Sequence, residues 1–285
     1  MYNLRYHIAS LVAVFLALAV GLLLGGLVVQ NGLVGDQVKA QVSALQKEFA
    51  TITAQSTAIK KTNDALTDFA GQTAPQLVAN TLTGRTILVI ASADTADTVA
   101  KVTQGVKAAG GTTAIATFSD PGLSLGDDGV TAAAGKALGI PASSVDETAV
   151  ITGLAREWTA TSDARTLTKA LVSAGALKFT GLAANETVGG TVVSDTFDGD
   201  PDPVAFQLAS AATPADRFAV GVETTKRADG TAASAKAAGL SGVDDVDTPV
   251  GEVSLVWVLT GRASGLFGQG ATVDSPFPTP LFPTP

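Results

Sequence analysis

The chain of 285 residues carries 18 basic and 26 acidic residues, for a formal net charge of -8, and contains no cysteine. This balance argues against a nucleic-acid surface, because phosphate binding needs clustered lysine and arginine. Without cysteine the chain forms neither a disulfide nor a lipoprotein anchor, so burial alone must hold an extracytoplasmic domain together.

The first predicted element is a membrane-spanning helix over residues 8–29. The run from Ile8 to Val29 has no charged side chain. At about 1.5 Å per residue it spans roughly 33 Å, enough to cross a bilayer core of about 30 Å. Arg5 and the terminal amine precede the run, so the positive-inside rule predicts that residues 1–7 are cytoplasmic and that the remainder is extracytoplasmic. A cleaved signal peptide is the alternative, but the run is longer than a usual h-region and no A-x-A site follows it.

Small residues recur at every fourth position of this run. The stripe consists of Ala13, Ala17, Gly21 and Gly25. Such a stripe lets two helix backbones approach closely, so it predicts that two spans pair. The alternative is that alanine and glycine are simply common in membrane helices.

A heptad pattern follows the span and predicts a coiled coil over residues 30–71. The d positions hold Val38, Leu45, Ile52, Ile59 and Leu66, and the a positions hold Val42, Phe49, Ser56, Asn63 and Ala70. Asn63 at an a position favours a parallel dimer, although isoleucine at d favours higher oligomers. The alternative is an amphipathic helix that packs on the chain's own globular domain. The narrow apolar seam and the polar opposite face favour the coiled coil.

The predicted globular part is a Rossmann-like α/β domain over residues 84–264. Gly71 and Pro75 predict a linker or helix break before it. The strands Thr86–Ile90 and Thr112–Phe118 flank a helical pattern from Val99 to Ala109, which makes a β-α-β unit and predicts a parallel sheet. The turn 91–97 contains no glycine, so the G-x-G-x-x-G phosphate motif is missing and we expect no dinucleotide cofactor.

The rest of the domain continues the alternation of strands and helices. Further strands are predicted at Ala176–Thr180, Thr191–Val193 and Phe218–Glu223, helices at Val204–Ala212 and in Ala-rich pieces of 127–175, and breaks at Gly139–Pro141 and Thr161–Asp163.

Two C-terminal segments complete the prediction. Asp247 to Pro249 predict the capped start of a buried helix that runs to about Thr260, with a buried strand as the alternative. Residues 265–285 are predicted to form a Gly/Pro-rich tail. Its final part, Pro276–Pro285, repeats Phe-Pro-Thr-Pro, is expected to be extended, and is interpreted as a linker or ligand outside the core.

The residue types restrict the chemistry. The one histidine is His7 and the one methionine is Met1. The globular domain therefore lacks soft metal ligands and histidine-based nucleophilic systems, so catalysis would have to rest on carboxylates, lysine or hydroxyls. We expect no metal, no cofactor and no enzymatic activity, and a cell-envelope enzyme is the alternative.

One acidic segment is a candidate calcium-binding loop. Its carboxylates are Asp195, Asp198, Asp200 and Asp202. An EF-hand-like loop from Asp198 needs glycine at its sixth position and glutamate at its twelfth, where the chain has Pro203 and Ala209. We therefore interpret the segment as a solvated acidic loop.

Four segments carry a resemblance to a known family. They are the opening stretch Leu4–Gly25, the first strand with Gly84–Val89, the helix start Asp247–Gly251, and the segment Ser264–Ala271, in which Phe267 replaces a tyrosine of the family pattern. As a set they resemble the actinobacterial family labelled copper transport outer-membrane protein MctB, also called SteB. The resemblance implies two roles, a channel-like role linked to low intracellular copper or membrane partnership with SteA-type proteins in cell separation.

The residues favour the second role. An outer-membrane barrel needs many alternating strands, whereas this chain offers one apolar helix and a coiled coil. Copper handling would lack soft ligands. We therefore predict a membrane-anchored, dimerising scaffold of the cell envelope, with itself, the membrane and a SteA-type protein as partners and no nucleic acid. Copper transport or efflux is the alternative.

Overall fold

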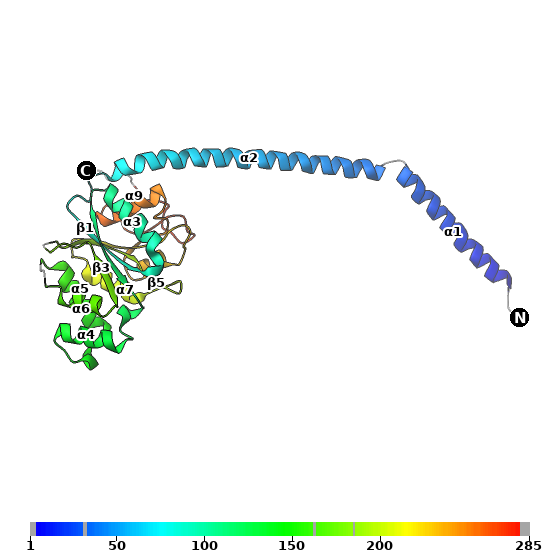
Figure 1. The fold of residues 1–285 in the computed structure, drawn as a ribbon. Helices are drawn as coiled ribbons and strands as arrows, with labels where there is room; N and C mark the ends of the chain where they lie inside the picture. Colours follow the sequence, from blue (N-terminus) through cyan, green and yellow to red (C-terminus); the bar gives the residue numbers. More distant parts are fainter. Residues whose placement is uncertain (1–3, 31–32, 162–163, 185, 280–285) are drawn as a thin grey trace. The chain divides into compact units, whose positions relative to one another are not determined.

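The computed structural model describes residues 4–30, 33–161, 164–184 and 186–279, and it divides into two compact units, Met1–Leu66 and Thr67–Pro285 (Figure 1). The helices are α1 (Leu4–Gln30), α2 (Leu33–Val78), α3 (Ala96–Ala108), α4 (Asp128–Leu138), α5 (Glu147–Thr159), α6 (Thr166–Ser173), α7 (Pro203–Ala212), α8 (Thr231–Ala237) and α9 (Pro249–Leu259), with short 3-10 turns η1 (Ala93–Thr95), η2 (Gly122–Ser124) and η3 (Ala142–Ser144). The strands are β1 (Thr86–Ser92), β2 (Thr112–Phe118), β3 (Leu177–Thr180), β4 (Val188–Ser194), β5 (Thr196–Phe197), β6 (Asp200–Pro201), β7 (Ala219–Val222), β8 (Ser241–Val243) and β9 (Leu266–Phe267).

The first unit is helical. Helix α1 contains the stretch His7–Leu27, which is long and apolar enough to cross a membrane by length and composition. Its apolar side chains are exposed in the isolated chain, as expected of a segment whose solvent is lipid. The predicted span therefore lies within one helix.

Helix α2 is longer than predicted. It continues through Gly71 and Pro75 to Val78, so the predicted helix break is wrong. Pro75 removes one backbone donor, but Gly71 and Pro75 are exposed, so water can satisfy the freed carbonyl. Ala74 and Val78 are buried on the domain, and this packing outweighs the cost of the proline.

The second unit is built on a mostly parallel sheet, as predicted. Its strand order is β3-β2-β1-β4-β7-β8-β9, with only the β2–β3 pair antiparallel. Central strand β1 pairs Val89 with Ile115 of β2 on one side and with Val192 of β4 on the other. The chain therefore leaves β1 in both lateral directions, which places the topological switch point between β1 and β4.

Helices cover both faces of this sheet (Figure 1). Leu88 and Ile90 of β1 pack in a core with α4 to α8, which includes Trp158 stacked on Phe179 at a ring-centroid distance of 5.3 Å. The alternate residue Val89 packs in a second core with α3, α9 and the end of α2. Because β1 is buried on both faces, its sequence is continuously apolar rather than alternating.

The buried segment after β8 is a helix, as favoured over a strand. Thr248 is the N-cap of α9, since its hydroxyl accepts a hydrogen bond from Gly251 N at 3.0 Å, and Pro249 occupies the first turn. Asp247, predicted to share the capping role, instead accepts hydrogen bonds from Thr225 N and Oγ1 at 2.7 and 2.8 Å. Gly251 and residues 253–259 are buried, while Glu252 is half-buried, so apolar residues surround most of the helix and no amphipathic pattern is present.

The segment predicted as tail begins inside the domain. Strand β9 pairs with β8, so the sheet extends beyond residue 264. The Asp244 carboxylate accepts hydrogen bonds from Gln269 N at 2.7 Å and Gly270 N at 2.8 Å and fixes the loop after β9. A Cβ at Gly268 would lie 1.7 Å from Asp244 Oδ1, so this close approach requires glycine. Residues 280–285 of the predicted tail lie outside the described residues, as do Ser162 and Asp163 of the predicted break.

Candidate functional site

The predicted seam of α2 is an exposed apolar face. Its seven large apolar side chains range from 47% exposed at Val42 to 67% exposed at Phe49. They are Val38, Val42, Leu45, Phe49, Ile52, Ile59 and Leu66. Asn63 on the same face is also exposed. Pairing of two chains along this seam stays a prediction.

Four threonine hydroxyls of α2 are hydrogen-bonded within the helix. The hydroxyls of Thr51, Thr53, Thr57 and Thr62 each donate to the carbonyl four residues earlier, at 2.8 to 3.1 Å. These residues need no polar partner from another element.

Two residues of the α1 stripe, Gly21 and Gly25, line a shallow hollow in the helix surface. Ala13, Ala17, Gly21 and Gly25 are exposed, and a Cβ added at Gly21 or Gly25 would meet no atom within 4 Å. The hollow is lined by Leu18, Gly21, Leu22, Gly25 and Gly26. The geometry suits close helix approach, and pairing of two spans stays a prediction.

The end of the seam face packs on the chain's own domain. Ala70, the last predicted a residue, is half-buried, and Ala74 and Val78 join the core formed with α9. A Cβ added at Gly71 would lie 3.8 Å from Pro249 Cγ. The alternative of a helix that packs on its own domain therefore holds for the last turns of α2.

This packing leaves an apolar hollow, which we call the α2–α9 groove. It has a volume of about 200 Å³. It is lined by Phe69, Ala70, Thr73, Ala74 and Leu77 of α2, by Pro249, Val250 and Val253 of α9, and by Phe277. The only polar side chain in this lining, Thr73, donates its hydroxyl to Phe69 O at 2.8 Å. The groove thus offers apolar surface and no unsatisfied side-chain donor.

A second hollow lies where ligands commonly bind in α/β proteins, at the carboxyl ends of parallel strands. This crevice, of about 560 Å³, is lined by Asp94, Asp97, Thr98, Ala100, Lys101, Thr224, Lys226, Arg227 and Asp247. Arg227 is occupied internally, since its guanidinium contacts the Asp229 carboxylate, the Asp94 carbonyl and the Thr196 hydroxyl. The lining holds three acidic and three basic side chains, so its formal charges sum to zero.

Buried carboxylates lie close to the same ends of the strands. Burial and, to a smaller extent, the charge of Asp202 together raise the pKa of Asp195, which follows β4, to about 7. Burial and a hydrogen bond with Asp229 raise the pKa of Glu223, which follows β7, to about 7. Burial also raises the pKa of Asp245 beyond β8. Sequence reasoning weighed Asp195 only as part of a solvated acidic loop and did not single out Glu223, although a carboxylate lies within two residues of the ends of β4, β7 and β8.

The acidic segment weighed as a calcium loop is not uniformly solvated, which corrects the prediction. Asp198 and Asp200 are exposed, but Asp195 and Asp202 are buried. Asp202 caps α7 by accepting a hydrogen bond from Val204 N at 2.9 Å and also accepts one from Gly122 N at 2.9 Å. Among the described residues, no group of three or more histidine, cysteine or carboxylate side chains is arranged to hold a metal ion.

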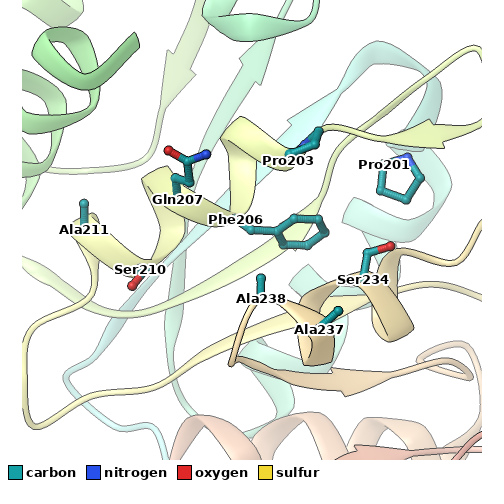
Figure 2. Close-up of a pocket in the computed structure, with 9 residues that line it drawn as sticks. All are labelled: Pro201, Pro203, Phe206, Gln207, Ser210, Ala211, Ser234, Ala237 and Ala238. Carbon is teal, nitrogen blue, oxygen red and sulfur yellow. The ribbon is translucent and has the colours of Figure 1, made fainter.

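A third hollow lies between α7 and α8. Figure 2 shows Phe206 projecting from α7 toward α8, with Ser234, Ala237 and Ala238 across from it. The hollow has a volume of about 640 Å³. Pro201, Pro203, Gln207, Ser210 and Ala211 complete its lining. This lining holds no charged side chain, so it offers no acid–base pair for catalysis.

Comparison with known proteins gives one match. A family model described as "Copper transport outer membrane protein, MctB" matches residues 1–278. No curated protein and no solved structure matches the chain. The matched range contains the apolar helix, α2 and the α/β domain.

Proposed function

The chain belongs to the MctB family, and on this premise we propose that it is a single-pass membrane protein that dimerises through α2 and acts as a scaffold of the cell envelope. Residues 1–7 lie in the cytoplasm, and the α/β domain lies outside the membrane. The domain presents surfaces to other proteins and carries no catalytic activity. The family match and the apolar helix support membrane anchoring.

One observation carries the dimerisation proposal. The seam of α2 exposes seven large apolar side chains at heptad spacing, whereas the last turns of the same helix bury Ala74 and Val78 on the domain. A helix with one exposed apolar stripe in water is stabilised mainly by packing that stripe. A second copy of α2, aligned in parallel, supplies a complementary stripe.

A SteA-type membrane protein is the proposed partner, on the basis of the family resemblance. The test is affinity capture of the full-length protein from native membranes, followed by identification of the captured proteins. A variant with Ile52→Asp serves as a control that separates dimer-dependent capture from domain-dependent capture. The scaffold proposal predicts a reproducible membrane partner, and capture of no protein beyond the bait contradicts it.

Copper transport is the second candidate, because the description of the matched family names it. The residues from Gly84 onward contain no histidine, cysteine or methionine, the side chains that favour copper. We therefore expect calorimetry of the full-length protein in detergent to show no stoichiometric copper site in that domain. A His7→Ala variant removes the one imidazole of the chain. A copper site of micromolar or tighter affinity in that variant would return copper transport to first place.

A further inference from the structure

We propose that the loop of residues 224–230 is a latch over the crevice at the carboxyl ends of the strands, closed by the Arg227 guanidinium and held by a proton that Glu223 shares with Asp229. Removal of that proton releases Arg227 and opens the crevice. This inference goes beyond the scaffold proposal and does not depend on dimerisation. It rests on hydrogen bonds within the α/β domain and on the hollow that the loop lines.

Arg227 joins segments that follow different strands of the sheet. Its Nη2 donates to the hydroxyl of Thr196, just beyond β4, at 2.8 Å, and its Nη1 donates to the carbonyl of Asp94, just beyond β1. Its Nε contacts Asp229 Oδ2 at 3.0 Å. The guanidinium therefore bridges the ends of β1 and β4, the switch point where open α/β sheets commonly bind ligands.

The same loop forms one wall of the crevice, whose lining includes Thr224, Lys226 and Arg227. The loop is anchored near its start, because the backbone N and the hydroxyl of Thr225 donate to the Asp247 carboxylate at 2.7 and 2.8 Å. Its other end is the start of α8. Release of Arg227 therefore frees the stretch between these two points, and with it this wall of the crevice.

A proton between two carboxyl groups completes the latch. Asp229 accepts on both oxygens, since Oδ2 contacts Arg227 Nε and Oδ1 accepts hydrogen bonds from the backbone N of Thr231, at 3.1 Å, and from its hydroxyl. The Glu223 side chain is hydrogen-bonded with that of Asp229. Two ionised carboxylates offer only acceptors, so this bond needs a proton, and the acceptor role of Asp229 places it on Glu223.

The surroundings of Glu223 keep this proton in place up to neutral pH. Burial, the hydrogen bond with Asp229 and the charges of Asp229 and Asp244 together raise the pKa of Glu223 to about 7, against a hydrogen bond from Gly230 N at 2.7 Å that lowers it. Because the pKa is raised, the stabilisation of the latch is fully present below the ordinary value of 4.5 and is lost as the pH rises through about 7. Above that pH, repulsion between the two carboxylates displaces Asp229, the group that orients Arg227 Nε.

The elements packed against β7 bring no compensating cation to Glu223 within the part of the chain that the structure describes. Helix α7 carries no charged residue. The charged side chains of the other two helices are engaged elsewhere: Lys236 of α8 pairs with Asp274, and Glu252 of α9 interacts with Lys101. In the loop itself Lys226 is exposed and Arg227 contacts Asp229. Glu223 therefore has no cation that would hold it in place once ionised.

The test is cleavage after Arg227 by an arginine-specific protease, applied to the full-length protein in detergent micelles. A guanidinium bound across the crevice cannot enter the specificity pocket of the protease, so cleavage reports release. The parent and a Glu223→Gln variant are compared at pH 6 and pH 8. The glutamine amide donates to Asp229 as the protonated carboxyl does, but it does not titrate. The ratio of the two rates at each pH removes the pH dependence of the protease itself.

The proposal predicts a ratio of parent to variant close to 1 at pH 6 and about tenfold at pH 8, since each pH unit above the pKa shifts the equilibrium by a factor of ten. Cleavage after Arg262, which is exposed outside the latch, is the internal control. Equal ratios at the two pH values overturn the proposal. A matching change at Arg262 also overturns it, because the whole domain then loosens.

A second variant tests the latch without any titration. Thr196→Val removes the buried hydroxyl that accepts from Arg227 and nearly keeps the side-chain volume. It should speed cleavage after Arg227 at pH 6 by at least about tenfold, as expected from loss of a hydrogen bond to a charged group. The matched control is Thr191→Val, whose buried hydroxyl bonds with that of Thr213 at 2.8 Å, away from the latch. Unchanged cleavage in Thr196→Val, or equal acceleration in both variants, contradicts the bridge.

Discussion

Replacing Ile52 with aspartate tests the proposed α2 seam at its centre. Ile52 is a d residue that is 53% exposed in the single chain, so roughly half of its side chain remains to be buried by a partner. Full burial of such a side chain contributes about 1.5 to 3 kcal/mol, so each chain contributes about 1 to 1.5 kcal/mol here. In a dimer, the substitution removes this burial contribution from both chains and also brings two aspartate carboxylates together.

We therefore expect the Ile52→Asp variant to weaken dimerisation by about 2 to 3 kcal/mol from lost burial alone. This corresponds to roughly a 30- to 150-fold rise in the dimer dissociation constant, and charge repulsion increases it further. Sedimentation of the full-length protein in detergent micelles, over a range of protein-to-detergent ratios, measures the change.

The matched control is Ala54→Asp, at the f position on the opposite face of α2. Ala54 is exposed in the single chain. Alanine to aspartate costs more helix propensity than isoleucine to aspartate, so general melting of α2 affects the control at least as strongly. If Ile52→Asp associates as tightly as the parent, or if the two variants weaken association equally, the seam is not where we place it.

Three further predictions concern the seam, the buried carboxylates and α9. Asn63→Leu should raise the stability of the dimer, because a buried asparagine costs about 1 to 3 kcal/mol relative to an apolar seam residue, and thermal melting measures this gain. The same variant should admit shifted alignments of the two helices, which disulfides between non-identical positions detect. The raised pKa of Asp195, about 7 against 3.8 unfolded, means that folding takes up a proton, so stability at this site falls by up to about 4 kcal/mol as the pH rises from about 4 to 7. Asp195→Asn should flatten that part of the profile in urea unfolding, and an unchanged profile contradicts the assignment. Gly251→Ala should destabilise the domain by about 1 to 3 kcal/mol or more, since the added Cβ would lie 2.0 Å from Asp245 O, whereas Gly126→Ala, whose Cβ meets no atom within 4 Å, should change stability little.

The elements that were predictable from sequence are those whose pattern is set by local burial. The apolar run of β1 predicted a buried parallel strand, because helices cover both faces of the sheet there. The start of α9 was predictable from Pro249 and from a capping hydroxyl or carboxylate before it. The structure assigns that capping role to Thr248.

The elements that were missed depend on contacts between distant residues. Helix α2 passes Pro75 because Ala74 and Val78 pack on α9, a contact that no local pattern shows. Strand β9 has only two residues and is fixed by Asp244 through the loop that follows it. The burial of Asp195 and Asp202 likewise follows from the packing around them, so the acidic segment was interpreted as solvated.

The central claim is that two chains pair in parallel along the α2 seam, and disulfide formation in native membranes tests it most directly. Single cysteines are placed at the d positions of Leu45, Ile52 and Ile59 and, as controls, at the f positions of Lys47, Ala54 and Lys61. A parallel, in-register dimer predicts efficient disulfides between identical d positions and little reaction at the f positions. Disulfides that form equally at d and f positions, or that join position 45 of one chain to position 59 of another in preference to identical positions, would contradict the account.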